Sequence, residues 1–255
     1  METIGIIAAM AQESGAFLPF IKEQERSRLG GLRCQRFQLG QRDCWMVTSG
    51  MGLRRAAQAT RRLVEAADPQ LLVSVGVAGA TSQDLAIGDV VACQQTCLLE
   101  RGAAGPRQSM AILSQAAWQA AEQALQGRGV RLVPGTAVST RGGQFIQQQG
   151  EKMLNPVLEM ETEGIAREAA EYGIPLLSLR AISDGPLAPI PFDLETMLDE
   201  QDNLRIGRVL TAVLAHPQMI PQLLRMGRHT RQAAENAAAA LTAALSQAGG
   251  LVFQG

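Results

Sequence analysis

One stretch, residues 157–184 (VLEMETEGIAREAAEYGIPLLSLRAISD), constrains the fold of this chain more than any other. It opens with a short apolar run that ends in acid, Val157–Met160. Small and apolar residues then recur at helical spacing over Thr162–Tyr172, and a glycine and a proline end that helix. The run Leu176–Ile182 has the length and apolar character of a buried strand. A strand–helix–strand unit of this size predicts a parallel pair of strands joined by a right-handed crossover.

Charged side chains are concentrated at the ends of both predicted strands. Glu159 and Glu161 follow the first strand, and Arg180 and Asp184 stand at the far end of the second. Ligands of such sheets bind beyond the carboxyl ends of the strands. Acidic groups from two strand ends, with an arginine beside them, therefore predict a reaction centre.

The composition fits one catalytic α/β domain and excludes several functional classes. The chain has 255 residues, of which 46% are hydrophobic and only 4% aromatic, so its core is aliphatic. A net charge of −1 gives no electrostatic footprint for nucleic acid. No apolar run approaches the length that spans a membrane, and the N-terminus lacks the basic region of a secretory signal. We expect a cytoplasmic protein without stable membrane insertion.

The cysteines predict neither a metal site nor disulfides. Cys34, Cys44, Cys93 and Cys97 show no CxxC spacing, and the two histidines are remote from them in sequence. Buried thiols in a reducing cytosol are the simpler interpretation than zinc.

Several further elements follow from the patterns of apolar residues and turn residues. A strand over Ile4–Ala9 precedes Glu13, which by itself reads as ordinary charge complementation in the first turn of a helix. No GxGxxG follows that strand, which weakens a dinucleotide-binding interpretation. The other predicted elements are a hairpin-like pair over Leu32–Leu39 and Cys44–Thr48, strands over Leu71–Val75 and Val130–Val138, helices over Leu53–Ala66, Met110–Leu125 and Leu194–Ala215, and a helix that begins near Pro221.

The blocks Glu159-Met160-Glu161 and Arg180–Asp184 resemble the paired motifs of the nucleoside phosphorylase/nucleosidase superfamily, in particular of bacterial methylthioadenosine/S-adenosylhomocysteine nucleosidases. The resemblance covers roughly the first 215 residues. It implies a three-layer αβα fold of the phosphorylase/hydrolase type, with a central mixed sheet. It also implies a catalytic domain over residues 1–216, with residues 217–255 as a C-terminal helical extension packed on the same domain.

The resemblance also implies catalytic roles. Asp184 would protonate N7 of adenine, and Glu13, with Arg180 nearby, would orient and deprotonate the attacking water. Glu161 would bind the ribose hydroxyls while Met160 packs beneath the sugar. From the residues alone, the turn around Asp184 would be unremarkable; it is the joint occurrence of these acids in family order that favours catalysis.

The remaining residues implied by the resemblance would line the substrate. Phe145 would stack on adenine and the main chain of Ile146 would read its edge, while apolar side chains would accommodate the 5′ group. The family carries a serine where this chain has Val77, whose side chain donates no hydrogen bond, and this counts against a phosphate site of the usual kind. The substrate-binding candidates are therefore Glu161, Met160, Phe145, Ile146, Met51, Met10, Val77, Gly79 and Phe192.

The activity implied is hydrolysis of the N-glycosidic bond of 5′-substituted adenosines such as methylthioadenosine or S-adenosylhomocysteine, with release of adenine. It needs no metal or organic cofactor, and the family generally forms dimers, so we expect a homodimer. An alternative within the fold is a hopanoid-associated phosphorylase that releases adenine from adenosylhopane. A non-catalytic adenosine sensor or dinucleotide-binding regulator is a third interpretation, but retention of Glu13, Glu161 and Asp184 argues against a dead site.

Overall fold

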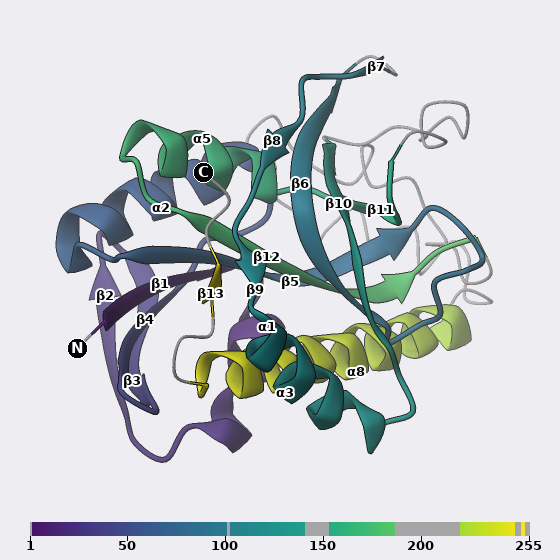
Figure 1. Cartoon of the computed structure of the whole chain (residues 1–255), viewed down its shortest axis with the longest axis horizontal. Coiled ribbons are helices and arrows are strands. Elements are labelled where there is room, and N and C mark those ends of the chain that lie inside the picture. Colours follow the sequence, from purple (N-terminus) through teal and green to yellow (C-terminus); the bar gives the residue numbers. More distant parts are fainter. Residues whose placement is uncertain (1, 101–102, 141–152, 187–219, 248–250, 253–255) are drawn as a thin grey trace.

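A single mixed β-sheet organises the protein (Figure 1). The computed structural model describes residues 2–100, 103–140, 153–186, 220–247 and 251–252. The sheet has 11 strands in the order β11-β10-β6-β12-β5-β1-β4-β3-β2, with β7 and β8 paired to β6. Its strands are β1 (Glu2–Ala8), β2 (Gln24–Leu29), β3 (Leu32–Leu39), β4 (Arg42–Thr48), β5 (Leu71–Ala80), β6 (Val90–Glu100), β7 (Ala103–Ala104), β8 (Gln108–Ser109), β10 (Leu132–Thr140), β11 (Pro156–Glu159) and β12 (Leu176–Asp184). A separate two-stranded ribbon pairs β9 (Ile112–Leu113) with β13 (Leu251–Val252).

Helices cover both faces of this sheet and make a three-layer αβα arrangement, as expected (Figure 1). Helices α2 and α5 lie on one face; α8, with α3 and the short α1 against it, covers the other. The described helices are α1 (Ala11–Gly15), the 3₁₀ turn η1 (Leu18–Phe20), α2 (Leu53–Ala67), α3 (Gln115–Gln126), α5 (Thr162–Glu171) and α8 (Ile220–Leu245). None of the helices in this part of the chain is both long and apolar enough to cross a membrane.

Part of the sheet closes on itself. Strand β11 pairs in parallel with β10 and also antiparallel with the end of β5, where Val157 lies opposite Ala80. Strands β5, β12, β6, β10 and β11 therefore form a closed ring of pairings. This closure places the ends of β5, β11 and β12 beside one another, which is where the charged residues of the motifs stand.

The predicted parallel pairing of β11 with β12 is wrong. The strand–helix–strand unit itself is present, but β12 runs parallel to β5 and antiparallel to β6. The reason is the length of β5, which continues past Val75 through the glycine-containing segment to Ala80 and lies between the other two strands. Local periodicity specifies an element, whereas long-range packing selects its partner.

Most other predicted elements are present with shifted ends. Strands β3 and β4 form the expected antiparallel pair, and α2 ends one residue beyond the prediction. The helix expected from Met110 is α3 and begins only at Gln115, because Ser114 caps it by accepting a hydrogen bond from the Ala117 N–H at 3.2 Å. The residues before the cap pair as β9. The helix expected over Leu194–Ala215 lies outside the described residues.

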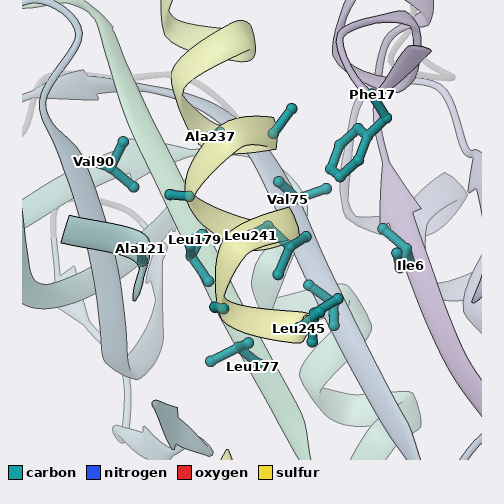
Figure 2. Close-up of a cluster of buried hydrophobic side chains, with 14 of the residues drawn as sticks. Ile6, Phe17, Val75, Val90, Ala121, Leu177, Leu179, Ala237, Leu241 and Leu245 are labelled. Atoms are coloured by element: carbon teal, nitrogen blue, oxygen red, sulfur yellow. The ribbon is translucent and has the colours of Figure 1, made fainter. Parts of the chain in front are cut away.

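Alternate residues of the central strands point to the two helical layers, so each face has its own aliphatic core. On the α8 face, Leu177 and Leu179 of β12 and Val75 of β5 pack against Leu241 and a series of alanines (Figure 2). Alanine has no side-chain entropy to lose and allows a helix to lie close to a sheet. The alanine-rich segment of α8 is thus a packing surface, and its leucines each contribute about 1.5–3 kcal/mol on burial.

Arg42, at the start of β4, links the end of α8 to β1 through hydrogen bonds. Its guanidinium Nη1 donates to the carbonyl oxygens of Leu245 and Gln247, the latter at 2.9 Å, and its Nε donates to Glu2 Oε2 at 2.8 Å. We expect Arg42→Met to lower the free energy of unfolding by about 1–3 kcal/mol, since the buried carbonyl of Leu245 and the partly buried one of Gln247 lose their donor. Urea unfolding followed by circular dichroism measures the change. The exposed Arg26 offers the control, and an unchanged midpoint for Arg42→Met would show that these contacts contribute nothing.

Candidate active site

Arg180 lies at the centre of a buried cluster of charges. It stands in the middle of β12, rather than after it, opposite Gly76 of β5, and its side chain is 1% exposed. A Cβ atom at position 76 would come within 2.5 Å of both Arg180 Nη1 and Glu13 Oε1. The glycine therefore leaves the space in which the guanidinium and the Glu13 carboxylate meet.

A polar network holds the rear of the guanidinium; the sequence analysis named its carboxylate, Glu159, but missed its two hydroxyl groups. Arg180 Nη2 donates to Ser74 Oγ at 2.6 Å and to Thr162 Oγ1 at 2.8 Å, and pairs with Glu159 Oε2 at 2.8 Å. A signal existed for one of these residues, because Ser74 interrupts an otherwise apolar strand. Thr162 carried no such signal, since it reads as the first residue of a helix.

Glu13 is buried and receives two backbone hydrogen bonds. Its Oε2 accepts from the Met10 N–H at 2.7 Å and its Oε1 from the Val77 N–H at 2.9 Å. Burial raises the pKa of Glu13, and the charge of Arg180 and the nearby N–H groups only partly offset the rise. Val77 thus contributes its backbone to the cluster. A buried carboxylate with a raised pKa is suited to act as a general base near neutral pH.

Glu161 faces the same guanidinium from the start of α5. Its Oε1 accepts from the Gly52 N–H at 2.9 Å, and its Oε2 lies 3.9 Å from Arg180 Nη1. Burial raises the pKa of Glu161 to about 7, helped by the charge of Glu159 and opposed by that of Arg180. Three buried carboxylates thus surround one guanidinium.

Asp184 occupies the last position of β12, at an irregularity in the pairing with β5 that places it opposite Gly79. A Cβ atom at Gly79 would lie 2.8 Å from Asp184 Oδ2, so this glycine too makes room for a carboxyl group. Asp184 Oδ1 accepts from the Ser183 hydroxyl at 2.7 Å. Burial raises the pKa of Asp184 above its ordinary value, and the Ser183 hydrogen bond opposes this. The partly exposed side chain is suited to deliver a proton.

The raised pKa of Glu161 predicts how stability depends on pH. Between pH 4.5, its ordinary pKa, and about 7, the folded protein holds a proton that the unfolded chain releases. The free energy of unfolding therefore falls as pH rises through this window, by up to about 1.4 kcal/mol per pH unit for this group. Chemical unfolding at several pH values should show a shallower decline for Glu161→Gln. If the free energy of unfolding fell equally with pH in the wild type and in Glu161→Gln, the raised pKa of Glu161 would be contradicted.

The structure places the predicted site residues as follows. Glu13, Glu161, Arg180 and the backbone of Val77 meet in one cluster, and Asp184 and Gly79 face each other at the end of the same two strands. Of the three predicted methionines, one donates its own N–H to Glu13 and two directly adjoin hydrogen-bonded residues in the chain, and all three are partly buried. Phe145, Ile146 and Phe192 lie outside the described residues. The partly buried methionines are Met10, Met51 and Met160.

Two other features stand apart from this cluster. A shallow cavity between β8 and α5 reaches Leu176, at the opposite end of β12 from Asp184. The four cysteines are buried and free, and burial raises the pKa of Cys93 to about 12. In the described ranges no group of His, Cys, Asp and Glu side chains is arranged to hold a metal ion.

Comparison with known proteins identifies the family of the chain. The sequence profile of the Phosphorylase superfamily matches residues 3–215. The chain is 28% identical over 199 residues to a 5′-methylthioadenosine/S-adenosylhomocysteine nucleosidase of Glaesserella parasuis, covering 71% of this chain and 85% of that protein. A nucleosidase of the same name from Oceanobacillus iheyensis is 28% identical over 207 residues, covering 75% and 90%.

Solved structures share the fold. The 5′-methylthioadenosine/S-adenosylhomocysteine nucleosidase of Neisseria meningitidis, in complex with methylthio-immucillin-A, superposes with a TM-score of 0.68 at 18% identity, over 96% of this chain and 99% of that one. A mutant of futalosine hydrolase from Helicobacter pylori gives a TM-score of 0.65 at 19% identity, over 95% of this chain and 98% of that one. Because the family profile matches most of its length, the chain belongs to the phosphorylase superfamily.

Proposed function

We propose that the protein hydrolyses the N-glycosidic bond of 5′-substituted adenosines, such as methylthioadenosine and S-adenosylhomocysteine, and releases adenine. The observation that carries the proposal is the buried cluster of Glu13, Glu161 and Arg180, with Asp184 on the same strand as the arginine. The names of the sequence relatives and the methylthio-immucillin-A complex of the Neisseria meningitidis nucleosidase support the same substrate class.

Asp184 acts as the general acid. Adenine is a poor leaving group as an anion, and protonation of its N7 converts it to a neutral one. A carboxyl group donates this proton near neutral pH only if its pKa is raised, and burial raises the pKa of Asp184. The Ser183 hydroxyl stabilises the carboxylate that remains.

Glu13 orients and deprotonates the attacking water, with Arg180 beside it. Glu161 binds the ribose hydroxyls, and Met160 packs beneath the sugar. Adenine binds against Phe145 and Ile146, and the end of β5, with Val77 and Gly79, forms one wall of the site. The 5′ substituent contacts Met10, Met51 and Phe192. These roles follow the family motifs, and the meeting of Glu13, Glu161 and Arg180 in one buried cluster supports the roles proposed for these three residues.

The charges of the cluster favour water over phosphate as the nucleophile. Within the described residues, the guanidinium of Arg180 is already paired with Glu159, and Glu13 and Glu161 add two further carboxylates. A phosphate dianion placed there would be repelled by each of these acids in its ionised form. Val77 also lacks the hydroxyl that a phosphate would accept from.

We further propose a cytoplasmic homodimer with residues 1–216 as the catalytic domain and 217–255 as a helical extension packed on it. The packing of α8 on β5 and β12 supports the second part of this division.

The test is release of adenine from methylthioadenosine, S-adenosylhomocysteine, adenosine and adenosylhopane, each with and without phosphate. Phosphate-independent release from the first two is the expected result. Release that requires phosphate would overturn hydrolysis, and release from adenosylhopane alone would replace the substrate class. Size-exclusion chromatography with light scattering tests the dimer.

A further inference from the structure

We propose that Glu159 is a positioning residue for this reaction: together with Ser74 and Thr162, it fixes the guanidinium of Arg180 from behind, so that the opposite edge faces Glu13 and Glu161. The proposal rests on the proposed function, which gives Arg180 its place beside the attacking water. Glu159 itself does not touch the substrate in this mechanism and acts through Arg180.

The hydrogen bonds of Glu159 show how firmly it is held. Its Oε2 accepts from the backbone N–H groups of Glu161 at 3.0 Å and Thr162 at 2.8 Å, and from the Thr162 hydroxyl at 2.7 Å. Its Oε1 accepts from the Ser139 hydroxyl, which in turn accepts from the Glu163 N–H at 2.9 Å. The carboxylate is therefore anchored to β10 and to the first turn of α5 before it meets Arg180.

The geometry of Arg180 divides its guanidinium into two edges. Nη2 carries two N–H groups and has three acceptors within 2.8 Å: Ser74 Oγ, Thr162 Oγ1 and Glu159 Oε2. This nitrogen is thus fully engaged at the rear. Nη1 is the nitrogen nearest Glu161 Oε2, at 3.9 Å, and it lies beside Gly76 together with Glu13 Oε1. Because the guanidinium is planar, fixing one edge fixes the other.

The burial of the pair makes the arrangement sensitive to charge. The side chains of Arg180 and Glu159 are 1% and 0% exposed, so neither can turn to solvent. Loss of Glu159 would leave Arg180 with Glu13 and Glu161 as its nearest carboxylates and draw it toward them. The other titratable group beside it is the Cys93 thiol on β6, which is neutral at physiological pH because burial raises its pKa to about 12.

The test uses Glu159→Gln, which keeps the shape of the side chain and removes its charge. We expect kcat for adenine release from methylthioadenosine to fall about 10- to 100-fold, with KM changed less than kcat. We also expect the fall of kcat/KM at low pH, the acid limb of its pH profile, to move to lower pH. The charge of Glu159 raises the pKa of Glu161, so removing this charge lowers that pKa. A purely structural role would lower the unfolding temperature without moving this limb.

Two further comparisons isolate the positioning effect. Thr162→Val removes the hydroxyl that links Glu159 to Arg180 and keeps the backbone donor, whereas Thr162→Ser restores the hydroxyl; we expect kcat to fall in the first variant and recover in the second. This pair also serves if Glu159→Gln does not fold. The matched control is Glu168→Gln on α5, a buried carboxylate that pairs with Arg61 outside the cluster, and it should leave the acid limb in place.

A crystal structure of Glu159→Gln provides a readout that does not depend on activity. We expect the guanidinium to leave Ser74 and Thr162 and move toward Glu13 and Glu161. If it keeps its two hydroxyl contacts and the pH profile is unmoved, the positioning role is wrong. If the wild type releases adenine from none of the nucleosides, the proposed function fails, and the position of the guanidinium still decides whether Glu159 holds it.

Discussion

Replacement of Asp184 by asparagine is expected to reduce kcat for adenine release by about 10²- to 10⁴-fold, the range for loss of a general acid. The amide fills the same space opposite Gly79 and still accepts a hydrogen bond from Ser183, but it supplies no proton. Affinity for adenine should therefore change much less than turnover. Steady-state kinetics with methylthioadenosine and calorimetry with adenine measure the two quantities.

The same variant separates an enzyme from an adenosine sensor. A binding protein that only senses adenosine would be largely indifferent to Asp184→Asn, because it needs no proton donor. The control is Asp68→Asn, an exposed position with φ of 43°, where asparagine adopts the left-handed conformation readily. If Asp184→Asn kept turnover within about threefold of the wild type, Asp184 would not be the general acid.

Glu13→Gln is expected to lower kcat by a similar factor of about 10²–10⁴, through loss of the base that takes a proton from water. Glu13 must be ionised to act, so activity falls as pH decreases through its raised pKa. In the variant, the fall of activity that remains at low pH should follow the protonation of Glu161 alone. The pH dependence of kcat/KM from pH 4 to 9 measures this.

The control for Glu13→Gln is Glu23→Gln, an exposed position in the same segment of the chain. Glu13 also has a structural role, because its carboxylate accepts the N–H of Met10 at the start of α1. If Glu13→Gln lowered the unfolding temperature and left kcat within tenfold of the wild type, that helix contact would be the whole function of the residue.

The sequence predicted those parts of the fold that depend on local pattern. The β3–β4 pair and α2 follow from periodicity and turn residues over short windows, and the structure confirms them. The three-layer class was implied by the family resemblance, and the structure confirms it as well. The start of α3 was predicted too early, because an apolar pattern alone does not show that Ser114 caps the helix and that Ile112 belongs to a strand.

The contacts that build the site join residues that are far apart in the sequence, and they were harder to predict. The acids Glu13 and Glu161 and Arg180 were singled out by motif, and the structure brings them together from α1, the start of α5 and β12. The groups that hold Arg180 in place were predictable only in part. Ser74 interrupts an apolar strand, but it precedes Arg180 by 106 residues, so no local pattern links the two side chains. Likewise, no local feature of β11 shows that it pairs with β5 instead of β12.

The position of α8 also sets an order of events during synthesis. Chains grow and fold from the N-terminus, so β5 and β12 leave the ribosome well before Ile220–Leu245 does. Until α8 emerges, Val75, Leu177 and Leu179 form an uncovered apolar face on the strands that carry Gly76, Arg180 and Asp184. Unfinished chains should therefore be inactive and prone to aggregate, and the nascent site becomes rigid only when α8 docks.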